Sequence, residues 1–325
     1  MNLLSMFKLG ELFTKVVFEN PEVIALKNEK FDLVISEAFF FQEPLLAFAH
    51  HFGCPNMVLY SVGYSINMNF FTGGAINPSY VPNVLGTGLT TENFFDRFKN
   101  TIATVTWLLG HQLYYLPKVD ARMREIFPDA PPIQDLLRNI SLTLVNNNNA
   151  LMSAVPLAPS VIEVAGLFIK PGKPLPPDLK KWIEDSEHGI VYFSLGSNLQ
   201  ANFLPQDKRD AIFASFRKLK QRVLIKWDGD IPTNAPKNCR FENWVPQQEV
   251  LAHRKVKVFV SHGGLLSTQE SVYHGVPLIG MPVYGDQHSN IAFATKQGFA
   301  VKVSIFDLTT EVFDAALQEV ITNAT

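Results

Sequence analysis

A histidine, two glycines, a serine and a glutamate follow one apolar segment at a spacing that suits the binding of an anion. Residues 256–261 (VKVFVS) are mostly apolar and β-branched, which is typical of a parallel strand buried on both faces. The next residues, 262–264 (HGG), predict a turn with free backbone N–H groups. Ser267 and Glu270 then have the capping-box spacing of a helix start. Because a helix N-terminus carries partial positive charge, the stretch predicts a site for a ligand that carries phosphate.

Several residues of this kind also have ordinary structural explanations. Glu270 would serve equally well as a helix-capping residue, and Asp286 as the N-cap of the following helix. Residues 193–197 (FSLGS) end another predicted strand, either in a plain tight turn or in one that donates to a phosphate. They are not a GxGxxG fingerprint, so nothing supports a dinucleotide site. Trp244 at a strand end is able to stack on a base, although tryptophans more often belong to a core.

The length and composition of the chain indicate a folded protein of two domains. Its 325 residues are 47% hydrophobic and 18% charged, which excludes a disordered chain. A net charge of −2, without a basic aromatic stripe, argues against nucleic-acid binding. Two cysteines exclude a disulfide scaffold and a four-cysteine zinc site. We expect no signal peptide, because Lys8 lies inside the apolar stretch 1–10 and no small-residue cleavage site follows. We expect no membrane span, because the longest uncharged run, 100–117, carries polar residues throughout.

Predicted strands and helices alternate along the chain, with a proline-rich segment in the middle. The segments 156–166 and 170–177 predict a crossing between domains, with boundaries of 1–165 and 166–325. The alternation on both sides predicts an α/β protein of two doubly wound, Rossmann-like domains that face a cleft. The predicted strands are 33–36, 56–60, 142–145, 190–195, 222–227, 240–243, 256–261 and 298–304. The predicted helices include 1–27, 44–51, 91–127, 178–185 (capped by Asp178), 206–220 and 310–321, and 70–89 is a predicted loop.

The stretch 259–287 resembles the signature of the UDP-glycosyltransferase family, which includes the animal UDP-glucuronosyltransferases and UDP-glucosyltransferases. Its fixed points are the aromatic-Val-Ser-His-Gly-Gly run, Glu270, Pro277, Pro282 and the pair Asp286-Gln287. Further matches are residues 31–61, FSLGS at 193–197, Trp244-x-Pro246-Gln247 and the proline-rich crossing, where Ala165 replaces a family glycine. The resemblance implies the GT-B fold, with an incomplete N-terminal acceptor-binding domain in 1–165. A UDP-sugar-binding domain, lacking its last helices, would occupy 166–325.

The resemblance assigns five residues to the nucleotide and the sugar of a UDP-sugar donor. Trp244 and Gln247 would hold uracil and ribose. Glu270 would accept from both ribose hydroxyls, as a carboxylate between adjacent hydroxyls can. Asp286 and Gln287 would bind the hydroxyls of the donor sugar. The implied reaction is an inverting transfer of a hexose to a small lipophilic acceptor, as in detoxification.

The same resemblance assigns the leaving diphosphate to preorganised donors rather than to a metal. His262, Ser197 and the amides around Gly263, Gly264 and Ser267 would stabilise its developing charge. The run Asp228-Gly229-Asp230 has the Asp-x-Asp form of metal-dependent glycosyltransferases of another fold. Asp-Gly is a common turn signal, and the family has a similar Asp-Gly here without a metal. The sequence therefore predicts no catalytic metal and no other cofactor.

Glu37 is the one catalytic position that the resemblance assigns to the first domain. In the family, an acidic residue here orients a catalytic histidine that lies on a much earlier loop. This chain has no equivalent, because it resembles the middle two-thirds of a family member and is incomplete at both ends. His50 and His51 fall at the end of their predicted helix opposite the strand end that bears Glu37.

Three functional hypotheses remain open from the sequence. The chain is part of an active transferase, or it is a short form that binds UDP without transfer and pairs with full-length enzymes. A remoter alternative is a UDP-sugar epimerase on the same fold. Both glucose and glucuronic acid occur as donor sugars in the family, and both stay open.

The resemblance also implies a location, and the sequence contains motifs for a modification. The parent protein would sit in the endoplasmic reticulum membrane, on the luminal side, and associate with itself or with other family members. Asn139-Ile-Ser141 and Asn323-Ala-Thr325 are N-glycosylation sequons, which have meaning for a chain that enters the secretory path.

Overall fold

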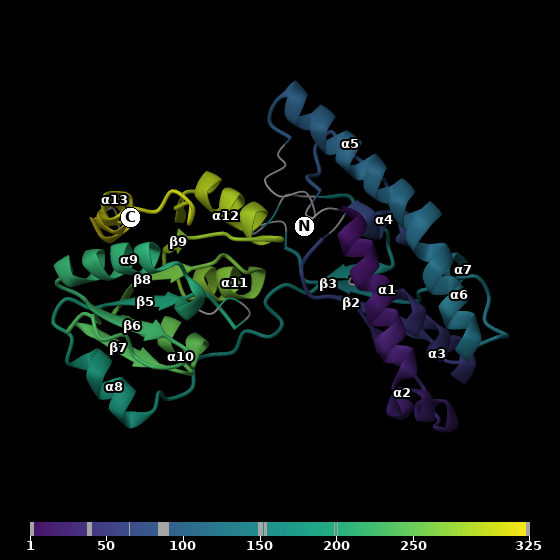
Figure 1. Cartoon of the computed structure of the whole chain (residues 1–325), viewed down its shortest axis with the longest axis horizontal. Coiled ribbons are helices and arrows are strands. Elements are labelled where there is room, and N and C mark those ends of the chain that lie inside the picture. Colours follow the sequence, from purple (N-terminus) through teal and green to yellow (C-terminus); the bar gives the residue numbers. More distant parts are fainter. Residues whose placement is uncertain are drawn as a thin grey trace. The chain divides into compact units, whose positions relative to one another are not determined.

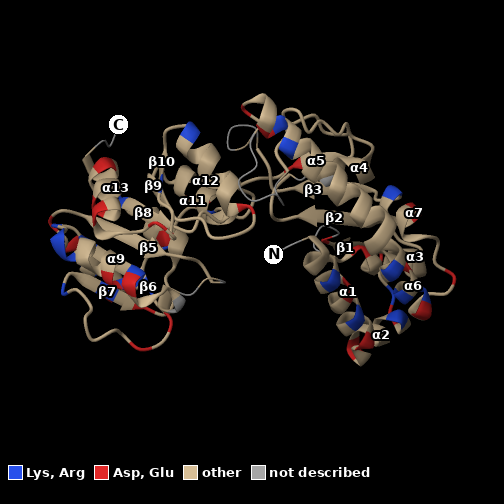
Figure 2. Ribbon diagram, turned by 45° about the horizontal axis from the view of Figure 1, so that its top comes forward, with Lys and Arg blue, Asp and Glu red and all other residues tan. Residues whose placement is uncertain are grey.

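Alternating strands and helices build two separate units in the computed structural model, Met1–Ala165 and Gly166–Thr325 (Figure 1). The structure describes residues 3–37, 41–64, 66–83, 91–148, 152, 155–197, 199 and 201–322. Each unit is organised around its own parallel sheet. Positive and negative side chains occur next to one another in both units (Figure 2). Within these ranges, no helix combines the length and the apolar character that crossing a bilayer requires.

The second unit holds six parallel strands in the order β10-β9-β8-β5-β6-β7. The strands are β5 (Ile190–Ser194), β6 (Arg222–Lys226), β7 (Cys239–Glu242), β8 (Val256–Ser261), β9 (Leu278–Gly280) and β10 (Ala300–Lys302). This is the doubly wound order, in which the chain starts in the middle of the sheet and adds strands first on one side and then on the other. The direction of winding reverses between β5 and β8, where Ser194 pairs with Ser261 at the carboxyl ends. Ligands of such sheets bind at this reversal.

The central strands of the second unit are buried between two layers of helices. Val191 and Phe193 pack with α9 (Gln206–Lys218) and α13 (Thr310–Thr322) in one apolar cluster. Ile190 and Tyr192 face the other way and pack in a second cluster, whose helices include α8 (Pro177–Glu184) and α10 (Gln247–Leu251) (Figure 1). Burial of both faces explains why β5 and β8 are continuous apolar runs rather than alternating ones.

The first unit holds four parallel strands that follow the chain order, β1 (Val34–Ser36), β2 (Asn56–Tyr60), β3 (Leu142–Val145) and β4 (Val161–Glu163). Its helices are α1 (Leu3–Glu19), α2 (Pro21–Ala25), α3 (Leu46–Phe52), α4 (Ile66–Thr72), α5 (Phe94–Gly110), α6 (Leu116–Ile126) and α7 (Ile133–Arg138). A π-turn, His111–Tyr115, joins α5 to α6, so the predicted helix 91–127 is one almost continuous helical path (Figure 1). Short 3₁₀ turns occupy Leu26–Asn28, Glu43–Leu45 and Ala201–Phe203.

Three local features differ from what the sequence predicts. β4 lies within the proline-rich segment that predicts a crossing, and it pairs with β3. α4 takes up the start of the predicted loop 70–89, of which 84–90 lie outside the described residues. α8 begins at Pro177 without a side-chain cap, because Asp178 pairs instead with Arg240 at 2.5 Å.

Candidate functional site

The reversal of winding brings the turn after β5 against the turn after β8. A Cβ placed on Gly196 would lie 2.7 Å from His262 Cε1, and one on Gly264 would lie 2.7 Å from His262 Nε2. Gly196 also has a φ of +88°, which side chains rarely adopt. The imidazole is therefore held between two positions that only glycine can occupy.

His262 is neutral in the folded protein at neutral pH. Burial lowers the pKa of its imidazole to about 4. Its Nδ1 is buried and has no hydrogen-bond partner among the described residues. A neutral imidazole offers one donor and one acceptor, so His262 is able to hydrogen-bond a ligand without bringing a fixed charge.

This lowered pKa predicts a loss of stability in acid. Unfolded His262 takes up a proton below about pH 6.5 and folded His262 only near 4, so protons favour the unfolded state in this window. The contribution of neutral His262 to the free energy of unfolding is fully present above pH 6.5. It falls by up to about 3 kcal/mol as the pH drops through 4. Urea unfolding at a series of pH values should show this loss in the wild type and a smaller one in His262→Gln. Identical pH profiles for the two proteins would contradict it.

Helix α11 (Leu265–Tyr273) begins earlier than the sequence predicts. Its N-cap is Gly264, which makes no side-chain cap, and Ser267 lies within the first turn, so the predicted capping box is wrong. The first helical hydrogen bond runs from Thr268 N to Gly264 O at 3.0 Å. The amides of Leu265, Leu266 and Ser267 consequently have no acceptor within the helix. They form the positive end of α11 beside His262.

Not all amides of this turn are free, contrary to the prediction. The Gly263 amide donates to Ser261 Oγ at 3.1 Å. The Leu265 amide interacts with the Asp286 carboxylate and opposes the rise of its pKa. Among the described residues, the amides at the start of α11 that have no partner are therefore those of Leu266 and Ser267, and these are the groups that an anion would meet.

Ser267 and Glu270 contact Gln247 rather than the helix start. Gln247 Nε2 lies 2.9 Å from Ser267 Oγ and 2.5 Å from Glu270 Oε2. Gln247 Oε1 accepts from the Tyr192 hydroxyl at 3.1 Å. Burial raises the pKa of Glu270, and hydrogen bonds from Gln247 and Gln248 oppose that rise. Gln247 thus ties α10, α11 and β5 together and fixes the direction of the Glu270 carboxylate.

Asp286 and Gln287 begin helix α12 (Gln287–Lys296). Asp286 is the N-cap residue but makes no side-chain cap; its Oδ2 accepts from Asn290 Nδ2 at 2.7 Å. Burial raises the pKa of Asp286, and hydrogen bonds from Asn290 and backbone amides oppose the rise. Gln287 is 3% exposed, and its Oε1 accepts from the amides of Val283 and Tyr284 at 2.9 and 3.1 Å. The amide oxygen of Gln287 therefore shapes the loop before α12.

Two predicted site residues are open to solvent. The Trp244 side chain, just beyond the carboxyl end of β7, is 74% exposed, so a face of its ring is accessible. Ser197 is exposed in the turn that follows β5. Together with Gln247, His262 and Asp286, they follow the carboxyl ends of β5, β7, β8 and β9. All ten predicted donor residues lie in the second unit.

Glu37 lies in the first unit, directly after the carboxyl end of β1. Its Oε1 accepts hydrogen bonds from the amide of Ser61, at 3.2 Å, and from the Ser61 hydroxyl. Gln42 Oε1 accepts from the Glu37 amide at 3.4 Å. In the part of the chain that the structure describes, no histidine is bonded to this carboxylate.

Two residues of the site were not predicted. Asn290 Nδ2 donates to Gly263 O at 3.0 Å as well as to Asp286, so it joins the turn after β8 to the start of α12. Its place four residues after Asp286 on a helix was the available signal. Tyr192 lies inside a fully apolar run, and nothing in that run marks its hydroxyl as a partner of Gln247.

The Asp228-Gly229-Asp230 run forms a turn in which an ion pair holds the Asp228 carboxylate. Asp228 Oδ2 pairs with Lys226 Nζ at 2.9 Å, and Asp230 O accepts from Trp227 Nε1 at 3.0 Å. Gly229 has a φ of +91°, as a glycine of a tight turn does. Across the described ranges, no three His, Cys, Asp or Glu residues gather closely enough to hold a metal ion.

The chain is similar to known sugar transferases in sequence and in fold. A family model described as UDP-glucoronosyl and UDP-glucosyl transferase matches residues 4–325. The UDP-glycosyltransferase UGT5 of Dactylopius coccus is 36% identical over 299 residues, covering 90% of this chain and 56% of that protein. UDP-glucuronosyltransferase 2B17 of Mus musculus is 34% identical, covering 95% of this chain and 58% of that protein. The chain thus spans somewhat more than half the length of these relatives.

Solved structures share the fold at low sequence identity. The glycotransferase of kitacinnamycin has a TM-score of 0.67 at 18% identity, covering 99% of this chain and 76% of its own. A UDP-glucosyltransferase from Polygonum tinctorium, capable of glucosylating indoxyl, has a TM-score of 0.64 at 18% identity, covering 98% and 74%. This likeness shows the GT-B fold.

Proposed function

Because this chain belongs to the UDP-glucuronosyl and UDP-glucosyl transferase family, we propose that its second unit binds a UDP-sugar at the carboxyl ends of β5 and β8. One observation carries the proposal. The turns after β5, β7, β8 and β9 lie on one edge of the sheet, and direct contacts join them. His262 packs on Gly196, Gln247 holds Glu270, and Asn290 links Gly263 to Asp286.

Each part of a UDP-sugar has a suitable group at this edge. Trp244 offers its exposed ring to the uracil, and the Glu270 carboxylate, directed by Gln247, accepts from the ribose hydroxyls. The neutral His262, Ser197 and the unused amides of α11 donate to the diphosphate. Asp286 and Gln287 bind the sugar hydroxyls.

The reaction we propose is the transfer of glucose or glucuronic acid to a small lipophilic acceptor, with inversion and without a metal. Departure of UDP places negative charge on the diphosphate. The N-terminus of α11 and the His262 N–H stabilise that charge in a partly buried place, where fixed donors act most strongly. From the family alone, we also propose a role in detoxification, the luminal side of the endoplasmic reticulum membrane, and association with other family members.

A second candidate function is UDP binding without transfer, in a short form that pairs with full-length enzymes. The surroundings of Glu37 favour it, because within the described residues its carboxylate bonds Ser61 and no histidine. General-base assistance is worth about 10²–10⁴ in rate. Turnover by the 325-residue chain alone, with a phenolic acceptor, would remove this candidate. Rapid conversion of the UDP-sugar without an acceptor would point to an epimerase instead.

The proposed donor site is tested by titrating the protein separately with UDP-glucose and UDP-glucuronate. We expect Trp244→Ala to weaken the binding of both by roughly 5- to 150-fold, the effect of about 1–3 kcal/mol of base stacking. Tyr273→Ala is the matched control, because Tyr273 is an exposed aromatic residue at the far end of α11. Equal affinities of wild type and Trp244→Ala would count against the stacking role. A wild type that binds neither donor would overturn the donor site.

A further inference from the structure

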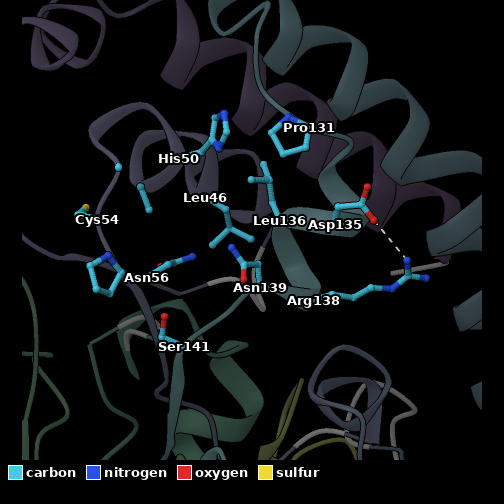
Figure 3. A pocket seen from close by; sticks show the side chains of 13 residues that line it. Leu46, His50, Cys54, Asn56, Pro131, Asp135, Leu136, Arg138, Asn139 and Ser141 are labelled. Atoms are coloured by element: carbon cyan, nitrogen blue, oxygen red, sulfur yellow. Dashed lines mark hydrogen bonds and ion pairs between the residues drawn. The ribbon is translucent and has the colours of Figure 1, made fainter.

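A hollow of about 600 Å³ opens in the first unit, between α3 and α7, at the amino ends of β2 and β3 (Figure 3). We call it the β2–β3 hollow. It lies at the edge of the sheet opposite Glu37, which follows the carboxyl end of β1. The proposed function uses none of its residues. Its volume falls within the roughly 300–1,000 Å³ of pockets that hold small ligands.

The lining of the β2–β3 hollow combines an apolar surface with a polar margin. Pro55 and Pro131 supply accessible apolar surface beside the buried Leu46 and Leu136, while His50 and Asn56 supply polar groups (Figure 3). Arg138 is bound to Asp135 at 3.3 Å, which keeps both charged groups at the margin. Such a surface matches a sugar ring, whose C–H faces are apolar and whose edges carry hydroxyl and amide groups.

The sequon Asn139-Ile140-Ser141 forms part of this lining. It connects the end of α7 to the start of β3, and both Asn139 and Ser141 line the hollow (Figure 3). Both residues are exposed. The Asn139 side chain makes no hydrogen bond within the described part of the chain, so its Nδ2 is available for reaction. Acceptor sequons of this kind lie in surface segments.

Two other asparagines, Asn77 and Asn323, begin sequon-like triplets that can be compared with Asn139. Asn77-Pro78-Ser79 has the outer residues of a sequon, but a central proline prevents modification. Asn323-Ala-Thr325 lies outside the described residues.

We propose that Asn139 carries an N-linked glycan whose first N-acetylglucosamine lies in the β2–β3 hollow. The glycan comes from a lipid-linked oligosaccharide diphosphate through the oligosaccharyltransferase of the cell. A bond forms between Asn139 Nδ2 and C1 of the sugar as the bond from C1 to the diphosphate oxygen breaks. The lipid diphosphate leaves with the electron pair, and the amide loses one proton to the enzyme's base. The proposal rests on the proposed luminal location and is independent of UDP-sugar binding.

Mass spectrometry of the full 325-residue chain, expressed behind a cleavable signal in insect cells, tests the modification. Trypsin releases residues 139–180 as one peptide with this single sequon, because it cleaves after Arg138 and Lys180 but not after Lys170 and Lys173, which precede prolines. We expect this peptide to carry a glycan in wild type and in Ser141→Thr, which keeps the sequon. It should be unmodified in Asn139→Gln and Ser141→Ala, while Asn77→Gln should leave glycosylation unchanged. Recovery of the wild-type peptide without a glycan would overturn the proposal.

A second measurement tests the place of the sugar. One endoglycosidase trims the glycan to a single N-acetylglucosamine, and an amidase removes it entirely and leaves aspartate. We expect the single-sugar form to exchange amide hydrogens more slowly over residues 46–56 and 133–141, and to unfold about 2–4 °C higher than Asn139→Asp. Equal exchange and equal Tm for these two forms would show that the sugar does not lie in the hollow.

Discussion

Replacing Glu43 with alanine should lower the free energy of unfolding of the first unit by about 3–5 kcal/mol. Glu43 is 2% exposed; its Oε1 lies 3.0 Å from His111 Nε2, and its Oε2 accepts from the Tyr115 hydroxyl at 3.2 Å. His111 and Tyr115 are themselves buried, so water cannot replace the lost carboxylate. Each unpaired polar group then costs about 1–3 kcal/mol, and the missing side chain leaves a cavity.

The π-turn His111–Tyr115 sets the geometry of this buried cluster. It is the one point at which the long helical path from α5 to α6 departs from α-helical spacing in the described residues. Both ends of the turn reach the same carboxylate, one on each oxygen. Trp107 stacks on His111 at 4.5 Å and Phe7 on Tyr115 at 5.6 Å, so aromatic rings seal the cluster. Single π-turns inside α-helices are rare and often occur where particular side chains have a specific role.

Hydrogen exchange of residues 116–126 in increasing urea measures the effect, because α6 packs in the core of the first unit. Glu43→Gln keeps the volume and one acceptor oxygen, so it should retain more stability than Glu43→Ala. Glu125→Ala is the exposed control. Glu125 pairs with Arg122 at 2.6 Å, but its side chain is 56% exposed, so we expect a loss below about 1 kcal/mol. Equal losses for the two alanine variants would show that the buried cluster does not stabilise the unit.

The sequence was sufficient to predict those strands and helices that have a clear apolar or amphipathic pattern of residues. The apolar runs of β5 and β8 predicted strands buried on both faces, and the amphipathic run 206–220 predicted α9. Two short elements escaped prediction: β4, whose three residues lie in a proline-rich segment, and α7, whose six residues give too few turns to define a period. The order of strands in the sheet is a tertiary property, and it decides which turns meet.

The candidate site shows the same division between local and tertiary causes. The resemblance named His262, Glu270 and Asp286 without the structure. That His262 is neutral follows from its packing between two glycines, which the sequence does not reveal. The capping box failed for a related reason: the local rule assigns Ser267 and Glu270 to the helix start, whereas Gln247, twenty residues earlier, binds both. Tertiary hydrogen bonds took precedence over a local preference.

Gly263→Ala is expected to destabilise the second unit by about 2–5 kcal/mol, more than Gly280→Ala. A Cβ on Gly263 would lie 2.4 Å from Ile291 Cγ1, and one on Gly280 would lie 2.3 Å from Ile291 Cδ1, so both overpack the same side chain. Gly263 alone of the two has a positive φ, +83°, which adds about 1–2 kcal/mol of backbone strain for alanine. Urea unfolding of each variant, in the wild-type and the Ile291→Ala backgrounds, separates these two causes.

Ile291→Ala removes the three atoms nearest to a Cβ on Gly280, so in that background Gly280→Ala should become nearly neutral. Gly263→Ala should still cost about 1–2 kcal/mol there, because neither the left-handed backbone nor the 3.3 Å approach to Gln287 O is relieved. It should also weaken UDP-sugar binding, since any rotation at residue 263 moves His262 and the start of α11, whereas Gly280 lies within β9. If Ile291→Ala rescued both substitutions equally, packing alone would hold the turn. The positive φ would then have no part in placing His262 and the free amides of α11.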